Sequence, residues 1–250
     1  MMTRRKFLAL SGLALPTVLA ADAFAEPTTL RVTKLSLGTG KLRFVHFTDL
    51  HYKGDESYAA QVVSKINELA PQFVVFTGDL VEEKRFAPAA LDFIRAIKSP
   101  VYGSPGNHDY RSGVAFSDFE RAFADTGGEW LVDCSAVLPE HNLEIVGMAI
   151  RGIHALQAPQ AERRLLLNHY PGLTDSIRDH RFDLMLSGHS HGGQVRLPFY
   201  GAPVLPWGVG PYDCGYYETA AGPLYVNVGI GTFYLPLRIN CRPELTLVEL

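Results

Sequence analysis

The residues best suited to chemistry in this sequence are histidines and aspartates that follow apolar runs. His189 and His191 stand two residues apart in the glycine-rich stretch 188–193, directly after the apolar run 182–186. Side chains at positions i and i+2 of an extended backbone point the same way, so both imidazoles can face one metal cluster. Glycines allow the backbone to fold tightly around such a cluster. A His-x-His pair alone is equally typical of a polar loop, so the other predicted strand ends decide between the two interpretations.

Four further segments place metal-type ligands where a predicted strand ends. They carry Asp49 and His51, then Asp79, then Asn107 with His108 and Asp109, and finally His169. In open α/β sheets, functional sites lie beyond the carboxyl ends of the strands, so we expect the five segments to converge. Imidazole, carboxylate and amide ligands together are typical of sites for manganese, iron or zinc.

The elements that must position these residues are those of an α/β protein. Apolar periodicity predicts helices at about 57–69, 88–98 and 117–125. One strand is predicted to begin at residue 100. The other predicted strands are 30–37, 41–48, 73–77, 130–132, 136–138, 143–150, 164–168, 182–186, 194–197, 215–219, 224–228 and 245–250. The first two strands are expected to be joined by a turn at 38–40. Strand–helix alternation followed by many strands predicts two mixed sheets packed face to face with helices outside, a four-layer α/β/β/α sandwich.

Length and composition are those of one globular domain. The chain has 250 residues, of which 47% are hydrophobic and 20% charged, and no repeat or long linker interrupts residues 26–250. The formal net charge of -3 leaves no basic footprint for nucleic acid. The spacing of Cys134, Cys214 and Cys241 excludes a zinc ribbon and a dense disulfide scaffold. Two interpretations stay open, in which Cys214 and Cys241 either pair after export or remain thiols.

The first 25 residues have the pattern of a signal peptide. Arg4, Arg5 and Lys6 precede an apolar run that ends near Leu19, and an A-x-A cleavage site occupies 23–25. The run is shorter than the about 20 apolar residues that a spanning helix needs. The adjacent arginines favour twin-arginine export, which predicts the twin-arginine machinery as a partner and a periplasmic or cell-envelope location. A Sec signal and a retained membrane anchor are the alternatives.

In their order along the chain, these blocks resemble those of the calcineurin-like metallophosphoesterases. That family's blocks D-x-H, G-D, G-N-H-D/E, H and G-H-x-H match residues 49–51, 78–79, 106–109, 169 and 188–191. The blocks span most of the predicted domain. The tail at 229–244 resembles a bacterial cell-envelope branch of the family that is exported by the twin-arginine route. The resemblance implies the metallophosphoesterase fold for residues 26–250.

The resemblance also implies two divalent ions, of manganese, iron or zinc, that share one carboxylate. One ion would be bound by Asp49, His51, Asp79 and His191, and the other by Asp79, Asn107, His169 and His189. Asp79 can bridge two ions about 3.5–4 Å apart, and a hydroxide bridging the ions would attack the phosphorus. His108 would protonate the leaving alkoxide, with Asp109 orienting its ring.

The predicted activity is hydrolysis of phosphomonoesters or phosphodiesters. One alternative is a lipid-pyrophosphate hydrolase that resembles the UDP-2,3-diacylglucosamine hydrolases, with membrane or cell-wall association. The other is a metal-free scaffold, which the complete ligand set disfavours. We expect an open site bordered by the irregular segment 194–217, whose aromatic residues could bind a lipid-like group or pack on the body. Arg238 and Arg242 could bind a substrate phosphate or belong to the tail structure.

Overall fold

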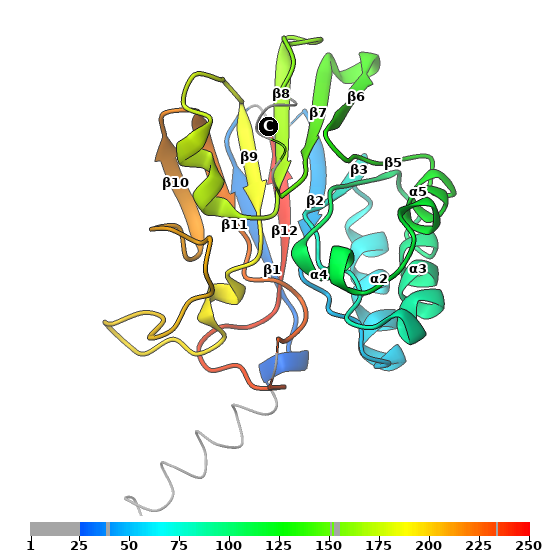
Figure 1. Ribbon diagram of the computed structural model, residues 1–250, viewed down its shortest axis with the longest axis vertical. Coiled ribbons are helices and arrows are strands. Elements are labelled where there is room, and N and C mark those ends of the chain that lie inside the picture. Colours follow the sequence, from blue (N-terminus) through cyan, green and yellow to red (C-terminus); the bar gives the residue numbers. More distant parts are fainter. Residues whose placement is uncertain (1–25, 39–40, 151, 153–155, 234) are drawn as a thin grey trace, which may run out of the picture.

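Two six-stranded mixed sheets pack face to face in this protein (Figure 1). The computed structural model describes residues 26–250 except 39–40, 151, 153–155 and 234. The signal peptide expected at 1–25 and most of the expected turn at 38–40 therefore lie outside the described residues. The two mixed sheets agree with the fold class predicted from the sequence.

The first sheet has the strand order β1-β12-β2-β3-β4-β5. Its strands are β1 (Arg31–Ser36), β12 (Glu244–Glu249), β2 (Arg43–Phe47), β3 (Phe73–Phe76), β4 (Val101–Gly103) and β5 (Glu129–Trp130). β12 runs parallel to β1 and antiparallel to β2. The first two strands exist as predicted, but β12 lies between them, so they are not the hairpin that their short connection indicates.

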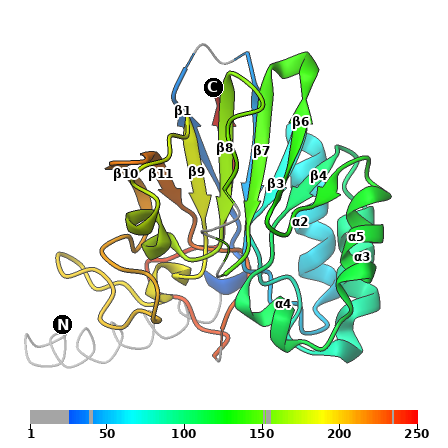
Figure 2. The ribbon, with the colours of Figure 1, turned by 45° about the horizontal axis from the view of Figure 1, so that its top comes forward.

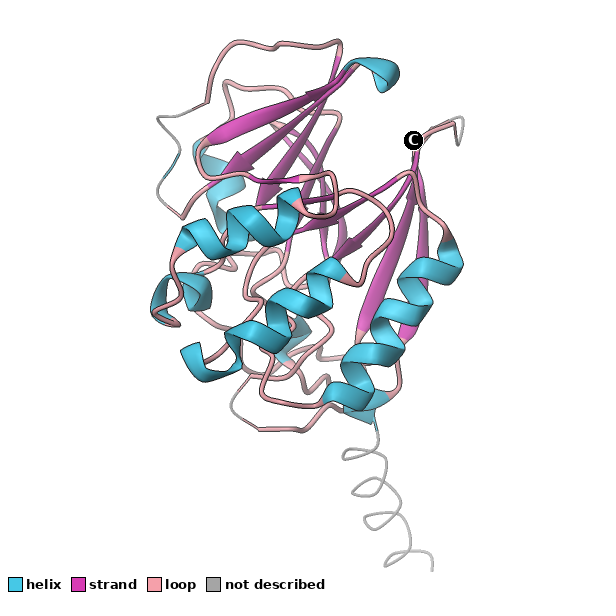
Figure 3. Cartoon of the chain, turned by 90° about the vertical axis from the view of Figure 1, so that its right-hand side faces the viewer, coloured by secondary structure: helices cyan, strands magenta, loops and turns pink. Residues whose placement is uncertain are grey.

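Three helices cover the outer face of the first sheet (Figure 3). They are α2 (Glu56–Leu69), α3 (Ala87–Arg95) and α5 (Phe116–Ala124). Helix α2 begins where the Asp55 side chain accepts a hydrogen bond from the Tyr58 amide, and it buries Val62 and Ile66. Every helix in the described part of the chain is too short or too polar to span a lipid bilayer.

The second sheet has the strand order β10-β11-β9-β8-β7-β6. Its strands are β10 (Gly215–Thr219), β11 (Gly222–Val226), β9 (Leu184–Ser187), β8 (Arg163–Asn168), β7 (Leu143–Met148) and β6 (Cys134–Leu138). The strand predicted at 194–197 is wrong, because Val195 and Leu197 form only isolated bridges, to Ile239 and Gly201. Pro198, which has no amide donor, and the positive φ of Phe199 prevent a ladder there.

The core lies between the two sheets. Phe44 and Phe73 from the first sheet stack at 4.8 Å between ring centroids and pack with leucines from β8 and β9. The outer face of the second sheet is covered, among the described residues, by the 3₁₀ helix η5 (Pro171–Ser176) and by loops. The fourth layer is therefore thinner than the α-helical layer over the first sheet.

Candidate metal centre

All seven predicted ligands lie together, beyond the carboxyl ends of strands from both sheets. Asp49 and His51 follow β2, Asp79 follows β3, Asn107 follows β4, His169 follows β8, and His189 and His191 follow β9. Figure 2 shows the short helix α4 (Asn107–Arg111) and the loops after β8 and β9 at this end of the sheets. The ligand atoms form close groups, namely Asp49 with His51 and His191, Asp79 with His169 and His189, and His51 with Asp79 and His108, each within 4.8 Å.

The first group suits a cation because lone pairs converge in it. The Nε2 atom of His191 lies 3.1 Å from Nε2 of His51 and 3.3 Å from Oδ1 of Asp49. The Asp49 Oδ1 atom is buried and has no hydrogen-bond partner. A buried carboxylate oxygen without a donor is costly unless an ion is bound to it. Imidazole and carboxylate ligands fit manganese, iron or zinc.

In the second group, the Asp79 Oδ2 atom lies 3.2 Å from Nε2 of His169 and 3.4 Å from Nε2 of His51. Asp79 therefore lies between the two groups, as a bridging carboxylate must. Asn107 Oδ1 lies 3.2 Å from the same His169 nitrogen. His169 Nδ1 is 2.7 Å from the Thr77 carbonyl oxygen, which fixes the proton there and leaves Nε2 as the ligand atom.

Charge interactions inside the centre are strong. Burial alone would raise the pKa of the Asp79 carboxyl, but the rings of His169 and His51 lower it to about 2. Burial would lower the pKa of His51, but its contacts with Asp49 and Glu82 raise it to about 10. In the same way, Asp79 outweighs burial and raises the pKa of His169 to about 9. A divalent cation would satisfy the carboxylates in place of the two ring protons.

Five of the seven ligands have a left-handed backbone. The φ angles are 54° at Asp49, 44° at His51, 63° at Asp79, 65° at His189 and 48° at His191. The extended backbone expected for His189 and His191 is therefore wrong, and the two rings belong to different groups. Positive φ in residues with a Cβ costs on the order of 1 kcal/mol each, and such strain is concentrated at functional sites.

Asp109 holds the backbone around Asp79. Its carboxylate accepts hydrogen bonds of 2.8 Å from the Asp79 amide, 2.9 Å from the Leu80 amide and 2.8 Å from the Gly106 amide. The role predicted for Asp109, orienting the His108 ring, is wrong because both carboxylate oxygens are engaged by these amides. Burial and the neighbouring Asp79 raise the pKa of Asp109 to about 6.

Glu82 takes the role that the sequence assigned to Asp109. Its Oε2 atom lies 3.1 Å from Nδ1 of His108 and 2.7 Å from Nδ1 of His51. Burial would raise the pKa of Glu82, but His108 and His51 lower it well below its usual value. The only sequence signal for this residue is an acidic side chain three positions after Asp79.

Arg238 does not contact the site as a phosphate ligand. Its guanidinium is completely buried and donates to the carbonyl oxygens of Val228, Gly229, Gly231 and Cys241. Phosphate binding by Arg238 is therefore excluded, and its role is to fix the 228–241 segment. The described thiols Cys134, Cys214 and Cys241 are all free, so the Cys214–Cys241 disulfide is not formed.

Five of the seven predicted ligands line a pocket of about 580 Å³, namely His51, Asp79, Asn107, His189 and His191. Its charged side consists of these five residues with His108 and Arg111. Its other side, here called the apolar wall, consists of Val195, Val204, Leu205, Trp207, Leu235 and Leu237. The Phe233 ring packs edge-on against the His108 ring, at 5.1 Å between centroids. The segment 194–217 thus borders the site as expected.

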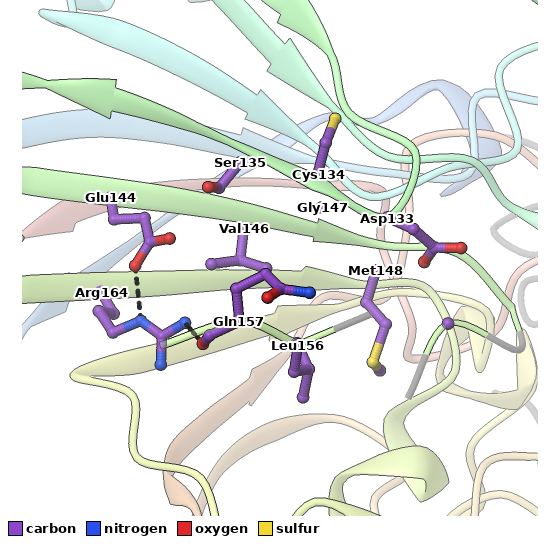
Figure 4. A pocket seen from close by; sticks show the side chains of 11 residues that line it. Asp133, Cys134, Ser135, Glu144, Val146, Gly147, Met148, Leu156, Gln157 and Arg164 are labelled. Atoms are coloured by element: carbon purple, nitrogen blue, oxygen red, sulfur yellow. Dashed lines mark hydrogen bonds and ion pairs between the residues drawn. The ribbon is translucent and has the colours of Figure 1, made fainter. Parts of the chain in front are cut away.

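A second cavity, of about 20 Å³, lies against β7 and β8 (Figure 4). It is large enough for a water molecule but too small for a substrate. The buried ion pair between Arg164 Nε and Glu144 Oε2, at 2.7 Å, lies along it. The cavity therefore does not compete with the metal centre as a catalytic site.

Comparison with known proteins gives the same result as the geometry. The profile of the calcineurin-like phosphoesterases matches residues 42–193. The uncharacterized metallophosphoesterase YkuE of Bacillus subtilis is 28% identical over all of this chain and 98% of its own length. The phosphodiesterase YaeI of Escherichia coli is 27% identical over the full length of both chains. The UDP-2,3-diacylglucosamine pyrophosphatase LpxG of Chlamydia trachomatis is 26% identical, covering 74% of this chain and 78% of its own.

The matched region contains every residue of the two ligand groups, from Asp49 to His191. Family profile and geometry therefore agree on metal-dependent hydrolysis of phosphoesters. This chain belongs to the calcineurin-like phosphoesterase family.

Proposed function

We propose that this protein is a phosphodiesterase that acts outside the cytoplasm. The observation that carries the preference for diesters is the charge of the pocket, whose described lining includes a single guanidinium, Arg111, and no lysine. A phosphodiester carries one negative charge and a phosphomonoester carries up to two. A diester therefore needs fewer cationic side chains, besides the ligand groups, to neutralise its charge. The relative YaeI is named as a phosphodiesterase, which supports the same choice.

Metal ions bound by the two ligand groups would polarise the phosphoryl oxygens and lower the pKa of water. Side chains of this protein donate the proton and bind the phosphate. Glu82 accepts the Nδ1 proton of His108, which leaves Nε2 as the atom that donates a proton to the leaving oxygen. Arg111, one helical turn after Asn107, is placed to bind the non-reacting part of the phosphate.

Turnover of bis(p-nitrophenyl) phosphate and p-nitrophenyl phosphate tests the proposal. Metal-stripped protein is reconstituted with manganese, zinc, iron or magnesium, and kcat/KM is measured for both substrates. We expect a higher kcat/KM for the diester with at least one of the first three metals. A higher kcat/KM for the monoester with every metal contradicts the proposal.

A second candidate is hydrolysis of an amphiphilic phosphoester or lipid pyrophosphate. The apolar wall faces the same pocket as the ligands, so an acyl or alkyl chain can pack on it while the phosphate reaches the centre. The name of the relative LpxG, UDP-2,3-diacylglucosamine pyrophosphatase, describes an enzyme that acts on a diacylated sugar nucleotide. A series of phosphodiesters with lengthening alkyl chains tests this candidate, which requires kcat/KM to rise with chain length and to fall in Leu237→Ser.

Export by the twin-arginine machinery, followed by residence in the periplasm or at the membrane or cell wall, is part of the proposal. It is supported by Arg4 and Arg5 before the apolar run. Replacing both by lysine keeps the charge but removes the guanidinium pair, so the uncut protein should stay in the cytoplasm. Fractionation that finds the double variant in the envelope, cut near Glu26, points to a Sec signal instead.

A further inference from the structure

Exposed apolar side chains gather on one projecting segment of the molecule. Of the ten large hydrophobic side chains that are exposed among the described residues, five belong to it, namely Leu197, Phe199, Tyr200, Val204 and Trp207. A sixth, Leu235, lies beside it, because its carbonyl oxygen accepts a hydrogen bond from the Gln194 side chain. The exposed fraction is 112% for Phe199, 86% for Trp207 and 74% for Tyr200, so these rings stand away from the body. Figure 1 shows the segment 194–212, in yellow to orange, extending outward from the sheets. We call residues 197–207 with Leu235 the aromatic patch.

The patch has almost no charge. Residues 194–212 contain no aspartate, glutamate or lysine, and their only arginine is Arg196. Arg196 is bound by the Asp213 carboxylate at 2.7 Å between Nη1 and Oδ2, which neutralises it. Burying a charged group in an apolar medium is costly, and this segment carries no unpaired one. Large exposed apolar patches mark interaction surfaces on soluble domains.

The turn at 197–201, here called the tip of the patch, is closed by hydrogen bonds within its own backbone. The Leu197 amide donates to the Gly201 carbonyl at 2.8 Å, and the Gly201 amide donates to Leu197 at 2.9 Å. The Tyr200 amide also donates to the Leu197 carbonyl, at 3.2 Å. These bonds satisfy the amides of Leu197, Tyr200 and Gly201, which lowers the cost of placing the turn in an apolar medium.

The patch is continuous with the pocket, and Glu26 lies at the same end of the molecule. Val204, Trp207 and Leu235 belong both to the patch and to the apolar wall. At the same end, the Glu26 carboxylate accepts a hydrogen bond from the Asn240 amide, and the Asn240 side chain donates to the Arg196 carbonyl. Glu26, where the described part of the chain begins, thus lies on the side that carries the patch.

We propose that the aromatic patch inserts into the interfacial region of a lipid bilayer and holds the mouth of the pocket at the membrane surface. The patch is a convex protrusion of tryptophan, tyrosine, phenylalanine and aliphatic residues, a composition that favours the boundary between headgroups and acyl chains. A protein partner would need a matching concave surface and a polar rim. The lack of a basic cluster means that apolar insertion, and not attraction to anionic lipid, drives the binding.

Tryptophan fluorescence of the full-length protein tests insertion directly. The chain has two tryptophans, and Trp130 is buried, so a change on mixing with vesicles reports Trp207. Vesicles of phosphatidylcholine with brominated acyl chains should quench Trp207 and shift its emission to the blue. The leader has no tryptophan, so its own binding does not produce this signal.

The variant Phe199→Asn with Tyr200→Ser removes the tip rings, and asparagine tolerates the φ of 66° at position 199. Neither residue lines the pocket, so hydrolysis of soluble bis(p-nitrophenyl) phosphate and the melting temperature should stay unchanged while most of the quenching is lost. The matched control, Val32→Thr with Val137→Thr, changes two exposed side chains on β1 and β6 and should keep full quenching.

Three results would overturn the proposal. They are no quenching of Trp207 by the vesicles, equal quenching in the Phe199/Tyr200 double variant, and quenching that appears only with anionic lipid at low salt. Vesicle binding is measured without turnover, so a failure of the proposed phosphodiesterase activity leaves this test intact.

Discussion

The carboxylate of Glu82 holds the ring of His108, with 3.1 Å between Oε2 and Nδ1. The same oxygen lies 2.7 Å from Nδ1 of His51, so one acidic side chain orients a predicted ligand and the predicted general acid together. Partners of this kind fix the tautomer of a histidine and tune its basicity.

Glu82→Gln should therefore lower both metal affinity and turnover. The amide keeps the shape of the side chain but removes the charge that stabilises both imidazoles. Changes of this kind lower metal affinity or activity about 10–100-fold. Metal titration and kcat on bis(p-nitrophenyl) phosphate measure the two effects. The neighbouring Glu83→Gln is the control, because Glu83 pairs with Arg85 at the surface. Equal behaviour of the two variants would refute the role of Glu82.

Asp79→Asn should abolish activity and reduce the metal content. Its Oδ2 atom lies between the two ligand groups, so an amide there removes charge from both positions. Elemental analysis of the purified variant measures the metal content. Asp92→Asn, which changes an exposed aspartate paired with Arg95, should leave both properties unchanged. Two ions at full occupancy in Asp79→Asn would exclude the bridging assignment.

His108→Asn should slow alkyl phosphodiesters far more than nitrophenyl esters. An alkoxide leaving group needs a proton, and general acid catalysis is worth roughly 10²–10⁴-fold. Nitrophenolate leaves without that help, so kcat on the activated ester should fall much less, with metals retained. His141→Asn, in the 3₁₀ helix η3 (Pro139–His141), serves as the control. An equal loss on both esters would assign His108 to phosphate binding instead.

Metal-stripped protein should lose stability as the pH rises from about 6.5 to about 10. The folded-state pKa values of His51 and His169 are raised from 6.5 to about 10 and about 9, so the folded protein binds protons more tightly than the unfolded chain. The stability from these protonated rings is complete below pH 6.5 and is lost as pH passes the folded pKa values. Lowered pKa values place His189 and His191 outside this window.

Thermal denaturation with a chelator and with added manganese measures this effect. In the metal-loaded protein the ions replace the ring protons, so its melting temperature should change less over the same range. Parallel pH curves for the two forms would contradict the electrostatic account of the centre.

The convergence of the seven candidate ligands could be predicted because it depends on local pattern. Apolar runs such as 165–167 and 184–186 end in polar residues, and parallel strands bring those ends together. Glu82 could not be found in this way, because its partner His108 lies in a different loop. The left-handed backbone of His189 could not be predicted from the sequence either, because packing imposes this φ angle against the preference of the residue.

Charge alone misled the prediction in two places. The positive charge of Arg238 made it a candidate for binding the substrate phosphate. Its guanidinium is instead completely buried and donates to backbone carbonyl oxygens. Asp109 stands beside His108 in sequence, but helix α4 directs its carboxylate toward the amides after β3. Adjacent residues on a helix point about 100° apart, so sequence neighbours there are poor candidates for a side-chain pair.

The placement of β12 sets the order in which this protein can fold. β12 pairs with β1 on one edge and with β2 on the other, and its Thr246 lies opposite His46. The sheet that carries Asp49 and Asp79 therefore stays open until residues 244–249 have left the ribosome. Contacts between distant parts of a chain form slowly, and unpaired strand edges promote aggregation in the meantime. We expect the sheet to be completed only once residues 244–249 are available, with a chain stopped before Glu244 exposing the facing edges of both β1 and β2.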